Sequence, residues 1–149
     1  MSKGKIAKEY FLNGLNCSQA VLCAFCDETG LSYETAYAIS SSFGGGMGRL
    51  REVCGAVSGM FMVVGLLYGN TNTKAEQYKI VQDLAAKFKA ENGSIICKEL
   101  LGVGGAQPPV PDERTTEYYK KRPCPELVEM AADILEEYIE KREKETANV

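Results

Sequence analysis

The chain contains no histidine and no tryptophan. Without an imidazole it cannot build a Cys/His zinc site, a serine triad or a Cys–His nucleophilic pair from its own residues. The missing histidine also excludes the Cys-x-x-Cys-His motif that attaches c-type haem. The side chains left for chemistry are thiols, carboxylates, lysine, arginine and tyrosine.

Long apolar runs and blocks of basic residues are also lacking. The most apolar segment, residues 56–68, is too short to span a bilayer and predicts a buried helix and no membrane association. There are 17 basic and 20 acidic side chains, and no Lys/Arg run interleaves with aromatic residues, so nucleic acid is not an expected partner. The first residues lead into a polar stretch rather than an apolar signal core. We therefore expect a cytoplasmic protein.

The length of the chain argues against disulfide bonds as the purpose of its cysteines. A chain of 149 residues is expected to form a single domain over residues 1–149. A domain of this size buries about 68–70% of the surface of its unfolded chain and does not need disulfide staples. Structural disulfides are rare in the cytosol, where cysteines tend to be metal ligands or redox groups. The six cysteines therefore need an explanation other than disulfide staples.

Hydrophobic periodicity predicts helices nearly throughout and no strand. The expected helices cover about residues 6–12, 17–28, 32–43, 52–68, 74–91, 95–101 and 125–144. The fold class is therefore all-α, a compact bundle of about six to seven helices around a buried apolar central helix, residues 52–68. Glycine is costly inside a helix, so Gly55, Gly59 and Gly65 should have a packing reason. These small residues would also allow the central helix to pack against a second copy, which leaves a homodimer open.

Four of the six cysteines stand where a helix is expected to begin: Cys17, Cys54, Cys97 and Cys124. Cys97, for example, lies three residues after Ser94, a good N-cap, and Cys124 precedes Pro125, a favoured first helical residue. A helix N-terminus carries partial positive charge and unpaired N–H groups, both of which favour a thiolate. The pattern predicts a shared site that holds sulfur in its anionic form. The alternative is that cysteine serves in these first turns as a small buried hydrophobe.

The spacing of these cysteines excludes the compact metal motifs. They are separated by 37, 43 and 27 residues, unlike the paired knuckles of a zinc ribbon or the run of a bacterial ferredoxin. Any shared site must therefore be assembled by tertiary folding. Arg49, Arg51 and Arg122 lie close in sequence to Cys54 and Cys124 and provide positive charge.

Two further features have competing interpretations. The glycine-rich turn 44–48 either brings backbone N–H groups to the sulfur site or is a plain interhelical connection, and its candidate cofactor-binding residues are Gly45, Gly46, Gly48 and Arg49. The Cys23-x-x-Cys26 motif resembles a redox motif, but it falls inside a predicted helix rather than at its start. We interpret Cys23 and Cys26 as core residues, with a role as a resolving thiol near Cys17 as the alternative.

The order of these motifs resembles the C_GCAxxG_C_C family of redox-active proteins. The resemblance rests on Asn16–Val21, Phe43–Gly48, Cys54–Gly59 and the single cysteines Cys97 and Cys124, and it extends from about Asn13 to the last helix. It implies that Cys17, Cys54, Cys97 and Cys124 are the characteristic cysteines of the family. Related domains attached to haem-bearing electron carriers further imply a metal centre.

Three functional hypotheses follow. The leading one is electron transfer through an iron–sulfur cluster, or another metal site, ligated by the four cysteines, with a redox partner protein of unknown identity. The second is a metal-free thiol/disulfide oxidoreductase in which the same cysteines are the catalytic thiols. The third is a non-catalytic module that binds zinc or another metal.

Overall fold

The computed structural model describes residues 1–147. These residues form helices and no β-strand, apart from one isolated antiparallel bridge between Val53 and Ile96. The all-α prediction is therefore confirmed. The helices are α1 (Lys3–Leu12), α2 (Cys17–Ala24), α3 (Cys26–Thr29), α4 (Tyr33–Ser40), η1 (Ser41–Phe43, a 3₁₀ turn), α5 (Gly44–Met47), α6 (Gly55–Tyr68), α7 (Lys74–Asn92), α8 (Cys97–Leu101), α9 (Thr116–Lys121) and α10 (Cys124–Ala147).

The bundle of six to seven helices is not confirmed, because several predicted helices are divided and others were not predicted. The helix expected over residues 17–28 breaks at Phe25, whose backbone leaves the helical region at φ −112° and ψ 21°. Cys26 therefore begins the short helix α3 instead of continuing α2. Helix α9 was not predicted.

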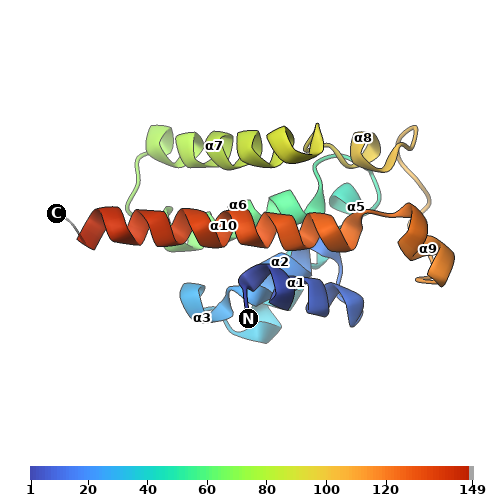
Figure 1. The fold of residues 1–149 in the computed structure, drawn as a ribbon, viewed down its shortest axis with the longest axis horizontal. Coiled ribbons are helices and arrows are strands. Elements are labelled where there is room, and N and C mark those ends of the chain that lie inside the picture. Colours follow the sequence, from blue (N-terminus) through green and yellow to red (C-terminus); the bar gives the residue numbers. More distant parts are fainter. Residues whose placement is uncertain (148–149) are drawn as a thin grey trace.

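A central helix surrounded by the others is not confirmed either. Helix α10 runs along the length of the molecule, with α7 on one side and α1, α2 and α3 on the other (Figure 1). Helix α6 packs against α2, α7 and α10. One side of α6 nevertheless stays open, since Leu66 is 42% exposed. Within residues 1–147, no helix is both long and apolar enough to cross a membrane.

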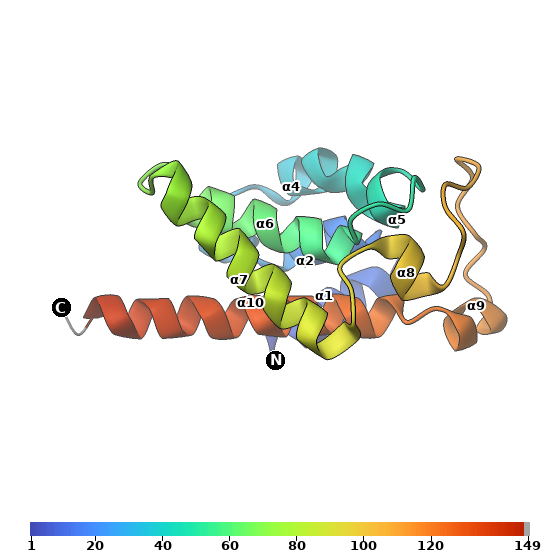
Figure 2. The same cartoon turned by 90° about the horizontal axis from the view of Figure 1, so that it is seen from above.

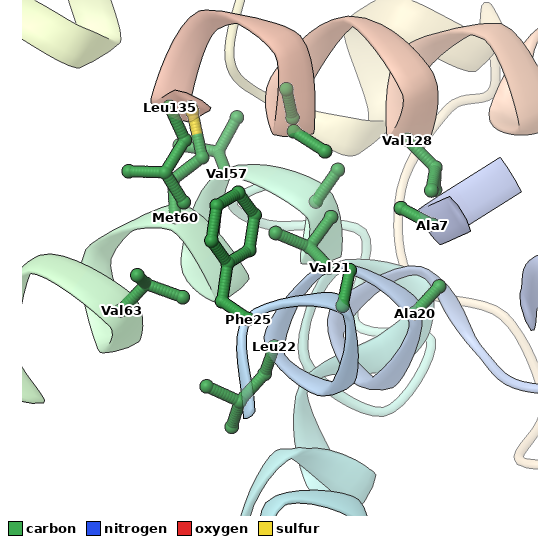
Figure 3. Packing of buried hydrophobic residues seen from close by; sticks show 14 of the residues in the cluster. Ala7, Ala20, Val21, Leu22, Phe25, Val57, Met60, Val63, Val128 and Leu135 are labelled. Atoms are coloured by element: carbon green, nitrogen blue, oxygen red, sulfur yellow. The ribbon is translucent and has the colours of Figure 1, made fainter. Parts of the chain in front are cut away.

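The core is built mainly between α2, α6 and α10. Figure 3 shows the fully buried ring of Phe25 among Val21, Val57 and Met60. The expected packing reason for small residues in α6 is confirmed at Gly59, where an added Cβ would lie 2.9 Å from the Cβ of Val21. It is not found at Gly65, where an added Cβ would have open space. The homodimer stays a prediction.

The core arrangement gathers several helix starts at one end of the molecule. Seen from above, the short elements α5, α8 and α9 lie at the end where α10 begins (Figure 2). Helix α6 follows α5 directly in the chain. The residues that begin these helices are therefore brought into one neighbourhood.

Candidate functional site

The four predicted cysteines do begin helices. Cys17, Cys97 and Cys124 are the first residues of α2, α8 and α10, and Cys54 is the N-cap of α6. The start of α2 is fixed by a capping box, in which the side chain of Asn16 accepts from the N–H of Gln19 and the side chain of Gln19 accepts from the N–H of Asn16. The helix-start prediction is confirmed for all four cysteines, but the N-cap of α8 is Ile96 and not Ser94, as the sequence had suggested.

All four cysteines line one cavity of about 360 Å³. The same cavity is lined by the predicted residues Gly45, Gly46, Gly48 and Arg49. Cys23 and Cys26 do not line this cavity. Cys23 lies in the hydrophobic core and Cys26 packs against it, and Cys54 and Cys124 join that core from the cavity side. The cavity is therefore lined by the four cysteines that the sequence pattern grouped together, and not by the other two.

Backbone hydrogen bonds place Cys54 beside Cys97. The N–H of Cys54 donates to the carbonyl of Ile95 at 2.8 Å, and the N–H of Cys97 donates to the carbonyl of Glu52 at 2.6 Å. These bonds flank the isolated bridge between Val53 and Ile96. Because both segments lead directly into helices, the bridge holds the starts of α6 and α8 together.

Two glycines allow the backbone to approach the cysteines closely. An added Cβ at Gly46 would lie 2.6 Å from the Cβ of Cys97, and one at Gly55 would lie 3.1 Å from the Cβ of Cys17. Real Cβ atoms do not pack at the first distance, so Gly46 cannot be replaced without a shift of the backbone. The glycine-rich turn therefore approaches the sulfur site, and donation of its N–H groups to sulfur stays a prediction. Its role in binding a cofactor stays a prediction.

The backbone of this glycine-rich turn has left-handed dihedral angles. Residues 45–49 all have positive φ, and Arg51 does too, at 62°. Glycine adopts this region freely, but at Met47, Arg49 and Arg51 it costs roughly 1–2 kcal/mol each. Such strain persists only where the surrounding contacts fix it, and it often marks a functional site. The glycines signalled a turn, whereas no sequence signal marks Arg49 and Arg51 as left-handed.

Arg51 links this turn to Cys97. The arginine is buried, and its Nη1 donates to the Cys97 sulfur at 3.5 Å. Burial raises the pKa of the Cys97 thiol, while the hydrogen bond and charge of Arg51 oppose that shift. Arg51 therefore offsets part of the effect of burial, and the pKa of Cys97 remains raised.

Cys17 and Cys124 form a second interacting pair. A hydrogen bond from the Cys17 thiol is the main cause that lowers the pKa of Cys124, to about 7, with smaller contributions from Arg122, the Tyr118 hydroxyl and Arg51. The same interaction raises the pKa of Cys17, and burial adds to the rise. Within the pair, Cys124 therefore has the lowered pKa and Cys17 the raised one.

The expectation that all four helix starts favour thiolates is wrong for three of the cysteines, because burial raises their pKa values. Burial raises the pKa of Cys54 to about 12, although the N–H groups of Ala56 and Val57 oppose the shift. The pKa values of Cys17 and Cys97 are raised as well. Desolvation disfavours the charged form, and at these three positions it exceeds the effect of a helix N-terminus. Only at Cys124 do the favourable interactions prevail.

Sequence reasoning missed Asp112, which holds the arginines of the cavity. Its Oδ2 lies 2.8 Å from Arg122 Nη2, 3.2 Å from Arg49 Nη1 and 3.9 Å from Arg51 Nη2. These guanidinium groups hold the pKa of the Asp112 carboxyl below its usual value. Asp112 lies between α8 and α9 in a segment without regular secondary structure, and no local sequence pattern marked this aspartate.

The cysteines are not arranged as a finished single-metal site. Within residues 1–147, no three cysteine, aspartate or glutamate side chains form a group that holds one metal ion. The donor set itself consists of four thiols lining the same cavity. This set matches the chemistry of thiolate-ligated centres, which use cysteine alone.

Fold and cavity together define an all-α protein with a clustered-thiol site. A family model described as "Putative redox-active protein (C_GCAxxG_C_C)" matches residues 15–138, and the chain belongs to this family. The resemblance drawn from the sequence motifs is therefore confirmed. Searches of curated proteins and of solved structures found no match.

Proposed function

We propose that this redox-active family member transfers electrons through an iron–sulfur cluster ligated by Cys17, Cys54, Cys97 and Cys124. The observation that carries the proposal is the shared cavity, which collects four cysteines from distant parts of the chain and excludes the remaining two. Thiolate-only ligation fits iron–sulfur clusters, and when bound such a cluster supplies reversible uptake and release of an electron. It also fits zinc, so the metal must be identified by experiment.

The surroundings of the thiols support an anionic centre. Four thiolates would concentrate four negative charges, which only nearby positive groups or a metal can balance. Arg51 donates to the Cys97 sulfur, and Arg122 favours the thiolate of Cys124. Hydrogen bonds and positive charge at cluster sulfurs raise the reduction potential, because they stabilise the more negative reduced state. We therefore assign both arginines to tuning the centre.

The raised pKa values of Cys17, Cys54 and Cys97 fit this proposal. A coordinating metal deprotonates a thiol outright, since its charge compensates the thiolate in place of water. The same cysteines are poor nucleophiles without a metal, because the nucleophile is the thiolate. Three of the four cavity cysteines are thus better suited to metal ligation than to free thiol chemistry.

The test is the iron, zinc and acid-labile sulfide content per chain of protein purified without oxygen. The proposal expects iron with matching sulfide, and an absorption band that dithionite bleaches. Zinc without sulfide, unaffected by dithionite, would instead support the non-catalytic metal module. Metal-free protein with six free thiols, which takes up no metal when iron and sulfide are added, would contradict both metal-binding hypotheses.

One observation favours the second candidate, a thiol/disulfide oxidoreductase. In the Cys17–Cys124 pair, the pKa of Cys124 is lowered to about 7, and the pKa of the neighbouring Cys17 thiol is raised. In that reaction, the Cys124 thiolate attacks a substrate disulfide and releases one substrate thiolate. Cys17 then gives up its proton and attacks the Cys124 sulfur, forming the Cys17–Cys124 disulfide and releasing the second substrate thiol. This mechanism does not require Cys54 or Cys97, whereas a four-cysteine cluster does.

A further inference from the structure

Three arginines of the cavity meet at a single carboxylate oxygen. Arg49 and Arg51 come from the left-handed turn and Arg122 from the residues just before α10, and all three approach Oδ2 of Asp112 within 3.9 Å. We call these three residues the arginine cluster. One carboxylate balances one of the three positive charges, so the cluster keeps an excess of positive charge.

The cluster is held in place by contacts other than Asp112. Arg49 Nε donates to the carbonyl of Pro108 at 2.7 Å, and Arg51 Nε donates to Gln107 Oε1 at 2.8 Å. The guanidinium of Arg122 lies 5.8 Å from the centre of the Tyr118 ring. These contacts do not use the Asp112 carboxylate, so they orient the arginines independently of that side chain, and Gln107 and Pro108 belong to the same segment as Asp112.

The cations are more buried than the anion that pairs with them. The side chains of Arg49, Arg51 and Arg122 are 14%, 5% and 17% exposed, whereas that of Asp112 is 41% exposed. Asp112 lies in a segment between α8 and α9 without regular secondary structure. A buried charge without full compensation is costly, and an anion that replaces or joins Asp112 removes part of that cost.

The cluster also lies beside usable space. Its three arginines line the same cavity of about 360 Å³ as Cys97 and Cys124. Pockets of this size hold small molecules, and the planar fork of arginine matches the oxygens of a phosphate or carboxylate group. A ligand held here by its oxyanion would lie next to the sulfur site.

We propose that the arginine cluster binds the phosphate or carboxylate group of a small molecule, and that the Asp112 carboxylate is its internal competitor. This site is distinct from the cysteine ligand set. It shares Arg51 and Arg122 with the surroundings of the thiols, whereas Arg49 pairs with Asp112 and contacts no cysteine sulfur in the hydrogen bonds described above.

The test uses the full chain and titrates inorganic phosphate by calorimetry at constant ionic strength, with chloride as the reference anion. Asp112→Asn keeps the shape of the side chain and removes the competing charge, so it should bind phosphate about tenfold or more tightly than the wild type. Adding Arg49→Gln to this variant should abolish the gain. Asp83→Asn is the matched control, because Asp83 pairs with Lys79 on the exposed face of α7 and should leave the affinity unchanged.

A second measurement keeps the proposal falsifiable if Asp112→Asn does not fold. In the wild type, phosphate should raise the melting temperature more than chloride does, and Arg49→Gln should remove that difference. Parallel titration with succinate separates a phosphate ligand from a carboxylate ligand, and binding of either supports the proposal. Equal, weak responses to phosphate, succinate and chloride in the wild type and in Asp112→Asn would overturn it.

Discussion

Helix α2 and the residues after it hold cysteines in two contrasting environments. Cys17, at the start of the helix, lines the cavity and interacts with Cys124. Cys23, near its end, lies in the same core as Phe25, and burial raises its pKa to about 12. Both cysteines are in one helix, yet only one of them meets other helix starts.

The comparison shows that the place of a cysteine in the fold outweighs the motif around it. Cys23 and Cys26 form the familiar Cys-x-x-Cys spacing, but burial raises both pKa values, and neither lines the cavity. Cys17, Cys54, Cys97 and Cys124 have no such motif and still assemble. We call the four cavity-lining cysteines and their neighbours the cavity region, and the residues around Cys23 and Phe25 the core region.

The largest expected effect is on bound metal. Cys97→Ser should reduce the iron content of anaerobically purified protein to background, because the cluster that we propose would lose one of its four ligands. Cys23→Ser is the matched control and should retain wild-type iron and sulfide, since Cys23 lies in the core. Metal analysis with folding checked by circular dichroism decides the matter. Equal loss from the two folded variants would remove the distinction between the regions.

The next effect is on stability, through two glycines with positive φ. Gly46→Ala should destabilise the fold by about 2–4 kcal/mol, because an added Cβ combines left-handed strain with a 2.6 Å approach to Cys97. Gly93→Ala should cost only about 1 kcal/mol, because Gly93 has a similar φ but open space. Urea unfolding monitored by circular dichroism measures both. Equal costs would show that the contact with Cys97 contributes nothing.

Local signals predicted the parts of the site but not their meeting. Asn16 and Pro125 mark where α2 and α10 begin, since capping and proline preferences depend on neighbours in the chain. The meeting of Cys54 with Cys97 depends on a bridge between Val53 and Ile96, which are far apart in the sequence. No local preference encodes such a contact, so the shared cavity was only a hypothesis until the fold was known.

The fold was limited in the same way. Apolar periodicity identified α6 and α7 well, because it reflects which face of a helix is buried. It did not reveal the break at Phe25, where apolar residues continue through the end of α2.

The reactivity of the thiols was misjudged for another reason. Helix starts are visible in a sequence, whereas burial, which raises the pKa of Cys54, is a property of the folded chain.

A smaller effect concerns thiol reactivity in metal-free protein. The alkylation rate of Cys124 should rise with pH and reach half its maximum near pH 7, because the thiolate reacts and the pKa of Cys124 is lowered to about 7. Cys23, with its pKa raised to about 12, should stay unmodified over the same range. Iodoacetamide labelling read by peptide mass spectrometry follows both sites.

The cause of that low pKa is open to its own test. Arg122→Gln removes a positive charge that favours the Cys124 thiolate, so the pKa should rise and the rate at pH 7 should fall by about two- to fivefold. Lys87→Gln is the control, since Lys87 lies over the Tyr138 ring and should leave the rate unchanged. A rate that does not change in Arg122→Gln would mean that the arginine does not stabilise the thiolate.

The smallest expected effect contrasts two fully buried serines, one beside Cys17 and one in α4. Ser18 Oγ has no hydrogen-bond partner among the described residues, whereas Ser40 Oγ donates to the carbonyl of Ala36 at 2.6 Å. Ser18→Ala should stabilise the protein by about 0.5–1 kcal/mol, because it removes an unsatisfied buried hydroxyl and improves helix propensity. Ser40→Ala should destabilise it by about 0.5–1 kcal/mol through the lost hydrogen bond. Chemical unfolding resolves these opposite signs. A destabilised Ser18→Ala would mean that the hydroxyl next to Cys17 is bonded in solution and belongs to the cavity region rather than to the core.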